Sequence, residues 1–201
     1  MESHASATPT PVSRTVGLQT DEMVAAARAG DQQALEWLVH HYRPGLLRFL
    51  REVTRDPELA EDLTQDAFLR AFARFAQLNN DAAFQAWLYR IARNLWLSQL
   101  RWRRLRRLIS LDQATGRSTT ESLGQRMPEI EGQPERASVH QTLAALSADD
   151  REVILLRYEA GFGVREIAGI LGVSTDAAQK RILRARDRFQ AHYGDHERLD
   201  G

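Results

Sequence analysis

Residues 93–107, RNLWLSQLRWRRLRR, combine concentrated positive charge with two indole rings. The segment contains six arginines together with Trp96 and Trp102, and it has no acidic side chain. Guanidinium groups bind phosphates and a tryptophan ring stacks on an unpaired base, so this composition suits contact with a nucleic acid. The alternative is that Tyr89 and Trp96 pack against the helix expected at residues 20–41, with the arginines surrounding that contact.

A second polar pattern lies on the helix expected after Pro57. Four side chains share one face at spacings of three, four and seven, namely Asp62, Gln65, Asp66 and Leu69. A catalytic or metal-binding carboxylate pair would need a further ligand in the same motif, and His40 and His41 belong to another helix. Two interpretations stay open: a solvated face on which Asp66 pairs with Arg70, and a docking surface for a basic partner.

The stretch 164–189, VREIAGILGVSTDAAQKRILRARDRF, predicts two short helices around a tight turn. Gly172 permits a left-handed turn, Val173 fills the space between the helices, and Ser174 is placed to cap the second helix. The buried side of that second helix would be Ala178, Ile182 and Ala185. Its exposed side would hold Asp176, Gln179, Lys180, Arg181, Arg184 and Arg188.

This exposed side has the chemistry of a helix that reads the major groove of DNA. Polar side chains near the helix N-terminus can contact base edges, and the arginines can bind phosphates. The alternative is a helical hairpin with a solvated basic face. Asp176 fits either a cytosine amino group or the positive end of the helix dipole.

Helices are the elements that position these side chains. Apolar residues recur at three- and four-residue spacings from Thr20 to Arg107, with breaks expected at Gly30–Asp31 and Pro44–Gly45. Asp56 is placed to cap the helix that begins at Pro57. The buried stripe of that helix would be Leu63, Ala67, Ala71 and Phe75.

A longer helix is expected from Phe84 past Trp102. Its core face would hold Phe84, Leu88, Ile91 and Leu95. Trp102 projects at the same angle as Phe84 and is expected to cap the core, whereas Trp96 projects from the opposite side with Tyr89 and Arg93. In the second half of the chain, Ser147 and Asp150 resemble a capping box, and Gly161 is expected to end the helix that follows them.

Composition divides the chain into four parts. We expect a disordered tail at 1–19, a helical domain at 20–107, a polar linker at 108–134 and a second helical domain at 135–194. Strand-like alternation is absent from the sequence. The expected fold class is therefore all-α, with two small helical domains joined by a flexible linker.

Bulk composition excludes several classes of site. The 201 residues include no cysteine, which excludes disulfides, thiolate metal ligands and cysteine nucleophiles and suits a reducing cytoplasm. No apolar run approaches the roughly 20 residues that span a bilayer. The first 17 residues lack the apolar core of a signal peptide.

Three segments together resemble a known family. AEDLTQDAFLRAFARF, FQAWLYRIARNLWLSQLRWRR and ALSADDREVILLRYEAGFGVREIAGILGVS followed by RILRAR are similar, in order and spacing, to extracytoplasmic-function (ECF) sigma factors. These are two-domain members of the bacterial sigma family, and the resemblance covers residues 21–107 and 135–193. It implies a transcription initiation factor, not an enzyme, that needs no cofactor or metal and works in the cytoplasm.

The resemblance also implies roles for particular residues. Asp62, Gln65, Asp66 and Leu69 would dock on the β′ clamp helices of core RNA polymerase. The following loop and long helix would read and melt the promoter −10 element through Asn79, Asn80, Trp87, Tyr89, Arg90, Arg93, Asn94, Trp96, Arg101 and Arg104. The turn and the last helix would read the −35 element through Ser174, Thr175, Asp176, Gln179, Lys180, Arg181 and Arg184.

The implied partners are core polymerase, through the β′ clamp helices and the β flap, double- and single-stranded promoter DNA, and an anti-sigma factor. Some residues depart from the family's pattern. Ala178 and Gln179 stand where a β-branched residue and a basic residue are common, and Trp96 and Ser98 stand where a small residue and an acidic residue are frequent. Two other functions stay open from the residues alone. One is a helix-turn-helix regulator that acts without polymerase, and the other is a small helical enzyme using Asp62 and Asp66 with a metal ion.

Overall fold

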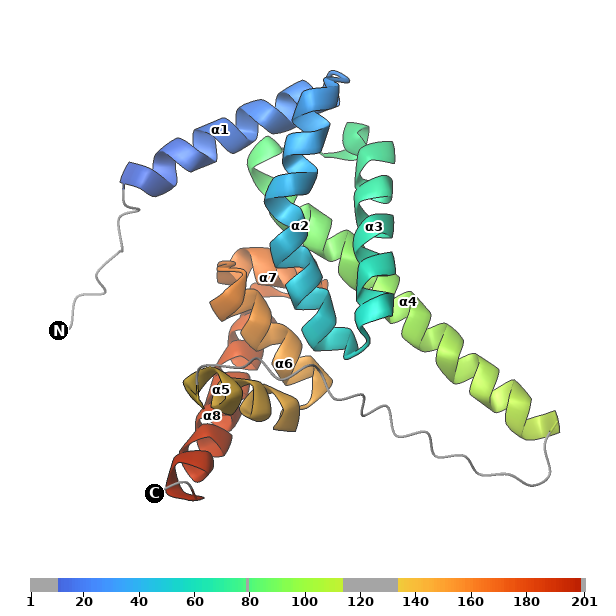
Figure 1. Cartoon of the computed structure of the whole chain (residues 1–201), viewed down its shortest axis with the longest axis vertical. Coiled ribbons are helices and arrows are strands. Elements are labelled where there is room, and N and C mark those ends of the chain that lie inside the picture. The colour runs from blue at the N-terminus through green and yellow to red at the C-terminus, as the bar shows by residue number, and fades with distance from the viewer. Residues whose placement is uncertain (1–10, 79, 114–133, 200–201) are drawn as a thin grey trace.

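The computed structural model describes residues 11–78, 80–113 and 134–199, and every element in these ranges is helical. Figure 1 shows two helical bodies lying against each other, with one long helix that extends past both. We call residues 11–113 the N-terminal body and residues 134–199 the C-terminal body. The predicted all-α class is confirmed for the described part of the chain.

The N-terminal body contains, in order, α1 (Pro11–Arg28), α2 (Gln32–Thr54), α3 (Pro57–Ala73), the 3-10 turns η1 (Phe75–Gln77) and η2 (Asp81–Ala83), and α4 (Phe84–Gln113). α2 packs between α1 and α3, and α3 packs along α4 (Figure 1). α1 begins inside the expected tail and α4 ends inside the expected linker. The other tail and linker residues, 1–10 and 114–133, lie outside the described residues.

The first predicted break is confirmed at Gly30–Asp31. Gly30 has φ 94°, a left-handed conformation that costs glycine little. Asp31 then caps α2, because its carboxylate accepts hydrogen bonds from the backbone N–H groups of Gln33 (2.8 Å) and Ala34 (3.3 Å). The sharp reversal lets α1 lie across α2.

The second predicted break, at Pro44–Gly45, is wrong, because α2 runs through both residues. Proline removes one backbone hydrogen bond and is unfavourable inside a helix. Pro44 is exposed, whereas the buried side of α2 continues past it from Leu38 to Leu46 and Leu50. Burial of this continuous apolar stripe outweighs the local cost of the proline.

The core of the N-terminal body lies where α2, α3 and α4 meet. The stripe predicted for α3 is buried: Leu63, Ala67, Ala71 and the following Phe75. On α4, Phe84 and Leu88 are fully buried, and the ring of Phe84 stacks on that of Phe75 with 5.7 Å between centroids. This core fixes which side of α4 faces its own body.

Asp56 joins the start of α3 to the middle of α4. One carboxylate oxygen accepts the backbone N–H of Leu59 at 3.0 Å, which confirms the predicted cap. The other oxygen accepts a hydrogen bond from Arg103 at 3.2 Å. One side chain therefore begins one helix and holds a second.

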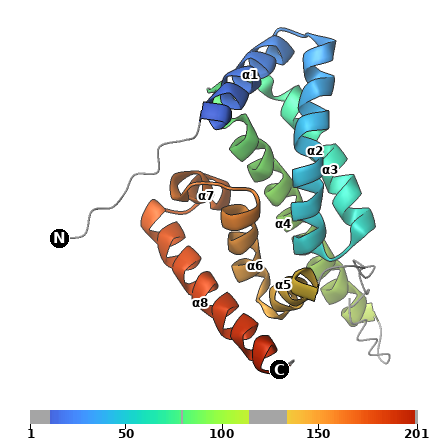
Figure 2. The ribbon, with the colours of Figure 1, turned by 60° about the vertical axis from the view of Figure 1, so that its left-hand side comes forward.

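The C-terminal body contains α5 (Pro134–Ala145), α6 (Ala148–Ile154), the π-helical turn η3 (Leu155–Glu159), α7 (Val164–Leu171) and α8 (Thr175–Leu199). α8 packs against α5, α6 and α7 and forms the outer edge of this body (Figure 2). Ser147 caps α6 by accepting the backbone N–H of Asp150 at 3.2 Å, as predicted. Gly161, with φ 76°, follows the π-helical turn.

The turn between α7 and α8 also matches the prediction. Gly172 has φ 68° and ends α7, and Ser174 accepts the backbone N–H of Ala177 at 3.2 Å at the start of α8. Ala178, Ile182 and Ala185 are buried against the rest of the body, as predicted. The turn and the buried side of α8 thus fix the direction of its exposed side.

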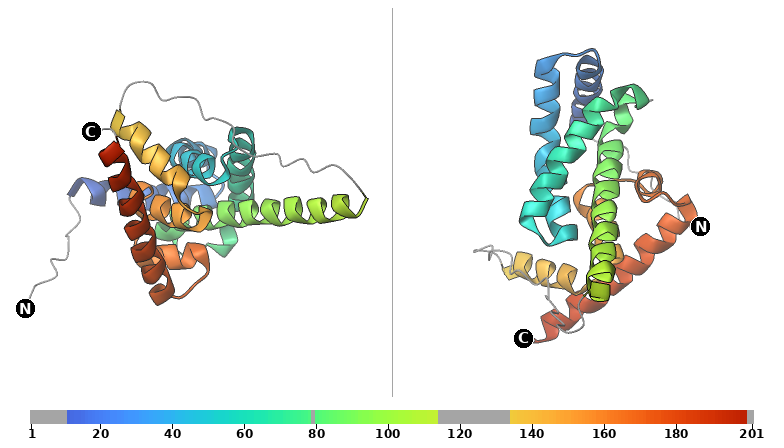
Figure 3. Two further views of the ribbon diagram at one scale, coloured as in Figure 1. Left: turned by 90° about the horizontal axis from the view of Figure 1, so that it is seen from below. Right: turned by 90° about the vertical axis from the view of Figure 1, so that its right-hand side faces the viewer.

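The two bodies are packed against each other. α7 lies against α4, and α6 lies against α2. Figure 3 shows that the C-terminal part of α4 extends beyond the other helices of both bodies. No described helix combines the length and the apolar composition that a membrane span requires.

We predict that two glycine-to-alanine changes in this turn region act in opposite directions. Gly172→Ala places a side chain at φ 68° with no atom within 4 Å of the new Cβ, so backbone strain alone lowers the free energy of unfolding, by about 1–2 kcal/mol. Gly169 lies inside α7 and also has open space around its Cβ position, so Gly169→Ala raises the free energy of unfolding by roughly 0.5–1 kcal/mol, because alanine favours a helix more than glycine does. Urea unfolding followed by circular dichroism measures both changes. Equal effects would contradict the assigned turn geometry.

Candidate functional site

Tyr89, Arg93 and Trp96 lie on one side of α4, at spacings of four and three. The sequence leaves open whether Tyr89 and Trp96 face outward or pack against the helix expected at residues 20–41. The structure buries both side chains, so the outward orientation is wrong for the packed chain. Tyr89 is 2% exposed and Trp96 is 4% exposed. The ring of Tyr89 contacts that of Phe49 of α2, with 5.2 Å between centroids, as well as the C-terminal body, so both bodies bury it. The periodicity of one helix cannot show such contacts with distant segments.

Two direct contacts close this side of α4. The ring of Phe162 meets the ring of Tyr89 edge-on, with 5.0 Å between centroids. Arg93 Nε donates to Glu152 Oε1 at 2.6 Å, and the two side chains are 14% and 4% exposed. Sequence analysis missed Glu152 and Phe162, because no local spacing links them to α4.

Burial controls the electrostatics at this contact. It raises the pKa of Glu152, and the neighbouring Arg93 guanidinium opposes that rise. Burial also raises the pKa of the Tyr89 hydroxyl far above its usual range. That hydroxyl lies against Gly45, where an added Cβ would be 3.2 Å away.

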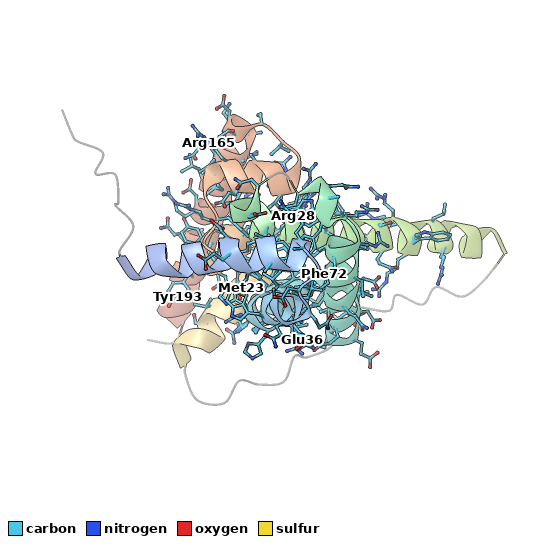
Figure 4. All side chains as sticks on the ribbon, turned by 90° about the horizontal axis from the view of Figure 1, so that it is seen from above. Met23, Arg28, Glu36, Phe72, Arg165 and Tyr193 are labelled. Atoms are coloured by element: carbon cyan, nitrogen blue, oxygen red, sulfur yellow. The ribbon has the colours of Figure 1, made fainter. Side chains whose placement is uncertain are left out.

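The exposed residues of α4 lie away from this contact and farther along the helix. Arg90, Asn94, Arg101 and Arg104 are exposed, and Trp87 is half-buried. Trp102, which was expected to cap the core, is 57% exposed, so that prediction is wrong. The helix has already passed the end of the N-terminal core when it reaches Trp102. Figure 4 shows side chains radiating from this part of α4 on the far side of α3.

Trp102 lies within a cationic surface. The guanidinium carbon of Arg106 lies 5.7 Å from the centroid of the Trp102 ring. Leu105 beside it is 49% exposed. We call the exposed residues Arg101, Trp102, Arg104, Leu105 and Arg106 the arginine arm. It presents one aromatic face together with three arginines.

The loop before α4 is held by α1. Arg28 donates to the carbonyl oxygen of Leu78 at 3.1 Å and forms an ion pair with Asp81. Figure 4 shows Arg28 at the end of α1 nearest this loop. Asn80 is exposed, and its carbonyl accepts the N–H of Ala83 at 3.0 Å. Asn79, the other loop residue predicted to read the −10 element, lies outside the described residues.

The four stripe residues of α3, Asp62, Gln65, Asp66 and Leu69, are all exposed. Leu69 is 60% exposed, which is unusual for a large apolar side chain on a helix with a well-packed core. A groove of about 320 Å³ lies beside the stripe and has Phe68, Phe72 and Val39 among its lining residues. Asp62, Gln65 and Leu69 line the same groove, so carboxylate, amide and apolar groups meet there.

The residues of α8 and its preceding turn are arranged as predicted. Ser174, Thr175, Asp176, Gln179, Lys180, Arg181 and Arg184 are all exposed. Ser174 uses its hydroxyl oxygen to cap α8. Arg188, predicted to be on the same face, forms an ion pair with Asp150 at 2.6 Å. Although burial acts to raise the pKa of Asp150, hydrogen bonds from Ser147 and Arg188 lower it.

The structure therefore places the predicted residues on separate surfaces. The α3 stripe, the arginine arm and the α8 face are exposed, while Tyr89, Arg93 and Trp96 are covered. Among the described residues, no group of three or more His, Asp or Glu side chains is arranged to hold a metal ion. The exposed polar side of α8 can fit a DNA groove, the exposed arginines can bind phosphates, and the exposed Trp102 ring can stack on an unpaired base.

Comparison with known proteins assigns both bodies. Residues 38–107 match the family model described as Sigma-70 region 2, and residues 136–189 match the one described as Sigma-70, region 4. The probable RNA polymerase sigma factor RfaY of Xanthomonas campestris pv. campestris is 37% identical over 162 residues. The match covers 80% of this chain and 40% of that relative.

Two further matches extend over nearly the whole of the proteins concerned. RNA polymerase sigma-H factor of Pseudomonas aeruginosa is 31% identical over 177 residues, which cover 84% of this chain and 91% of the relative. The solved sigma factor RpoE, in complex with the anti-sigma factor NepR from Bartonella quintana, has a TM-score of 0.63 and 29% identity. It covers 78% of this chain and 94% of that chain. The chain therefore belongs to the ECF group of RNA polymerase sigma factors, the transcription initiation factors that direct polymerase to promoters.

Proposed function

We propose that residues 20–107 bind core polymerase and read and melt the −10 element, and that residues 135–194 read the −35 element. The observation that carries this proposal is the exposed side of α8. Its polar residues begin at the helix N-terminus, and its arginines follow within three turns. A helix held on its other side by Ala178 and Ile182 can enter a major groove without losing its own packing.

The α3 stripe and its groove form the proposed contact with core polymerase. Asp62 and Asp66 supply negative charge, and Leu69 supplies an apolar side chain that projects into solvent. The groove floor of Phe68 and Phe72 can receive apolar side chains of a partner helix. The proposed partner element is the pair of β′ clamp helices, with the β flap contacting the C-terminal body.

Residues of the loop before α4 and of α4 itself would meet the −10 element. Asn80, Trp87, Arg90, Asn94, Arg101 and Arg104 are accessible in the packed chain, whereas Tyr89, Arg93 and Trp96 are largely covered. Glu152 of the C-terminal body pairs with Arg93, and Tyr89 contacts both Phe162 of that body and Phe49 of α2. Asn79 belongs to the same proposal. The exposure of Trp102 adds an aromatic candidate that the sequence had assigned to the core.

The proposed setting is the cytoplasm, where RNA polymerase and promoter DNA are found. An anti-sigma factor is a further proposed partner, since the similar sigma factor RpoE was solved in complex with the anti-sigma factor NepR. A cavity lined by Arg48 of α2 and by Val139 and Tyr158 of the C-terminal body gives such a partner a surface that includes both bodies.

The whole proposal is tested by run-off transcription from a fragmented genomic pool with core polymerase and this protein. We expect promoter-specific transcripts, and alignment of their upstream sequences would supply the recognised elements. Arg184→Ala should weaken binding across all promoters and reduce the salt dependence by about one charge, whereas Gln179→Ala should relax preference at one −35 position. Arg74→Ala, which removes an exposed arginine at the end of α3 in the other body, is the control. A pool that yields no transcript would overturn the proposal.

We predict that Asp62→Arg weakens binding to core polymerase about tenfold or more, because it places a cation where the proposed partner is basic. Asp62 is exposed and forms none of the described ion pairs, so the fold should be unaffected. Glu22→Lys on α1, which packs on α2 on the side away from α3, reverses the same charge at an exposed position and is the matched control. Biolayer interferometry with immobilised core polymerase compares the two. Equal losses would show that net charge, not the stripe, controls binding.

We predict different effects for Trp96 and Trp102, the two tryptophans of residues 93–107. Trp102→Ala should shorten the lifetime of the promoter open complex without changing stability, since stacking contributes about 1–3 kcal/mol per base, while Trp102→Phe should retain most of that lifetime. Trp96→Ala should lower the free energy of unfolding by about 3–5 kcal/mol, because the ring is buried. Heparin-challenge lifetimes and denaturant unfolding measure the two properties. An unchanged lifetime for Trp102→Ala would remove Trp102 from the DNA contact.

A further inference from the structure

The loop before α4 is held from outside by a side chain of α1. Nη2 of Arg28 donates to the carbonyl oxygen of Leu78 at 3.1 Å, and the same nitrogen forms the ion pair with Asp81. These two acceptors lie on either side of Asn80 in the sequence. One side chain from a preceding helix therefore holds the backbone before Asn80 and the turn after it.

The bonds within the loop are local. The N–H of Leu78 donates to the carbonyl oxygen of Phe75, and the N–H of Ala83 donates to that of Asn80, both at 3.0 Å. Each bond closes one 3-10 turn, the first at the end of η1 and the second at η2. Neither bond joins one turn to the other, whereas Arg28 contacts both. The relative position of the two turns thus depends on α1.

α1 can act as this anchor because its own position is well defined. Val24 and Ala27 are buried, and α1 packs on α2 and against η2. Gly30, with φ 94°, reverses the chain two residues after Arg28, which leaves the guanidinium at the end of α1 nearest the loop (Figure 4). The match to the Sigma-70 region 2 model covers residues 38–107, so α1 precedes the matched segment.

We propose that Arg28 is a positioning residue for promoter reading, which fixes the loop around Asn80 so that the loop selects the base it meets in the −10 element. This proposal rests on the proposed function of the loop. A loop that is ordered before binding discriminates between bases more sharply than one that can rearrange around each of them. The ion pair also neutralises Asp81, whose carboxylate would otherwise repel the DNA backbone.

Base preference is measured by run-off transcription from a promoter library that is randomised in both recognised elements, with the transcripts counted by sequencing. Arg28→Met removes both contacts and keeps most of the apolar part of the side chain. If the loop prefers one base about tenfold, this variant should reduce the preference at that −10 position to about threefold or less, and leave the −35 preferences unchanged. Arg28→Lys keeps a charged donor and should retain most of the preference.

Two further variants separate positioning from charge. Arg74→Met removes an exposed arginine just before η1 that belongs to none of the ion pairs of the described residues, and it should leave the preference unchanged. Arg28→Met combined with Asp81→Asn removes one charge of each sign. We expect this double variant to keep the reduced preference, with a salt dependence of promoter binding equal to that of the unmodified protein.

Two outcomes of these measurements would overturn the positioning role. Full recovery of base preference in the double variant would show that Arg28 acts only by neutralising Asp81. An unchanged preference in Arg28→Met, with a salt dependence lowered by about one charge, would show that Arg28 contacts a phosphate directly.

The contact itself is tested in the free protein by hydrogen–deuterium exchange. Arg28→Met should speed exchange several-fold in peptides that cover residues 75–83, and leave α3 and α4 unchanged. The midpoint of urea unfolding should stay close to that of the unmodified protein, because the two members of the ion pair are 36% and 26% exposed.

Unchanged exchange in residues 75–83 would overturn the proposed anchor. Faster exchange with an unchanged base preference would overturn the positioning role and leave the contact established. A failure of the proposed function would instead appear as a genomic pool without transcripts, with the exchange measurements unaffected.

Discussion

The arrangement depends on α4 being a single straight helix whose first half is covered on two sides. One side completes the core of the N-terminal body through Phe84 and Leu88, and the other receives Phe162 and Glu152 from the C-terminal body. The helix is long enough to serve both contacts and still extend beyond them. Every surface proposed for DNA is positioned relative to this one element.

The two contacts of α4 differ in chemistry. The core side is aromatic and aliphatic, with the ring centroids of Phe75 and Phe84 5.7 Å apart. The opposite side is mixed, with one edge-on aromatic contact and ion pairs that lose hydration when they form. An apolar contact persists because water is excluded from large continuous areas, whereas a polar contact between domains is close in free energy to its separated state. The same helix therefore has an apolar interface on one side and a mixed aromatic and ionic interface on the other.

Arg151 shows how the C-terminal body keeps its shape at this contact. It is 5% exposed, and it donates to the carbonyl oxygens of Leu143 (2.7 Å) and Leu146 (2.9 Å) at the end of α5. Burial lowers its pKa to about 10, so it still carries its charge at neutral pH. The arginine also reaches the carbonyl oxygen of Glu52 in α2 at 3.4 Å. It thus connects α5 to α6 and contributes to the packing of the two bodies.

Sequence periodicity and capping residues predicted most helices and their internal faces. Asp31, Asp56, Ser147 and Gly172 were informative because each satisfies backbone groups within a few residues of itself. Pro44 misled the prediction, because burial along the whole of α2 exceeds a local propensity. Trp96 and Trp102 were assigned to the wrong environments for a different reason. Trp96 is buried and Trp102 is exposed, and these environments depend on distant helices and on where the core ends, neither of which is encoded in the spacing of a single helix.

Asp56 gives the arginine arm a mechanical property. Because its two oxygens hold the N-terminus of α3 and the guanidinium of Arg103 at once, α4 is braced where it leaves the core. The angle between the α3 stripe and the arginine arm is fixed by the packing of α3 along α4, and this carboxylate ties the two helices together where α4 leaves the core.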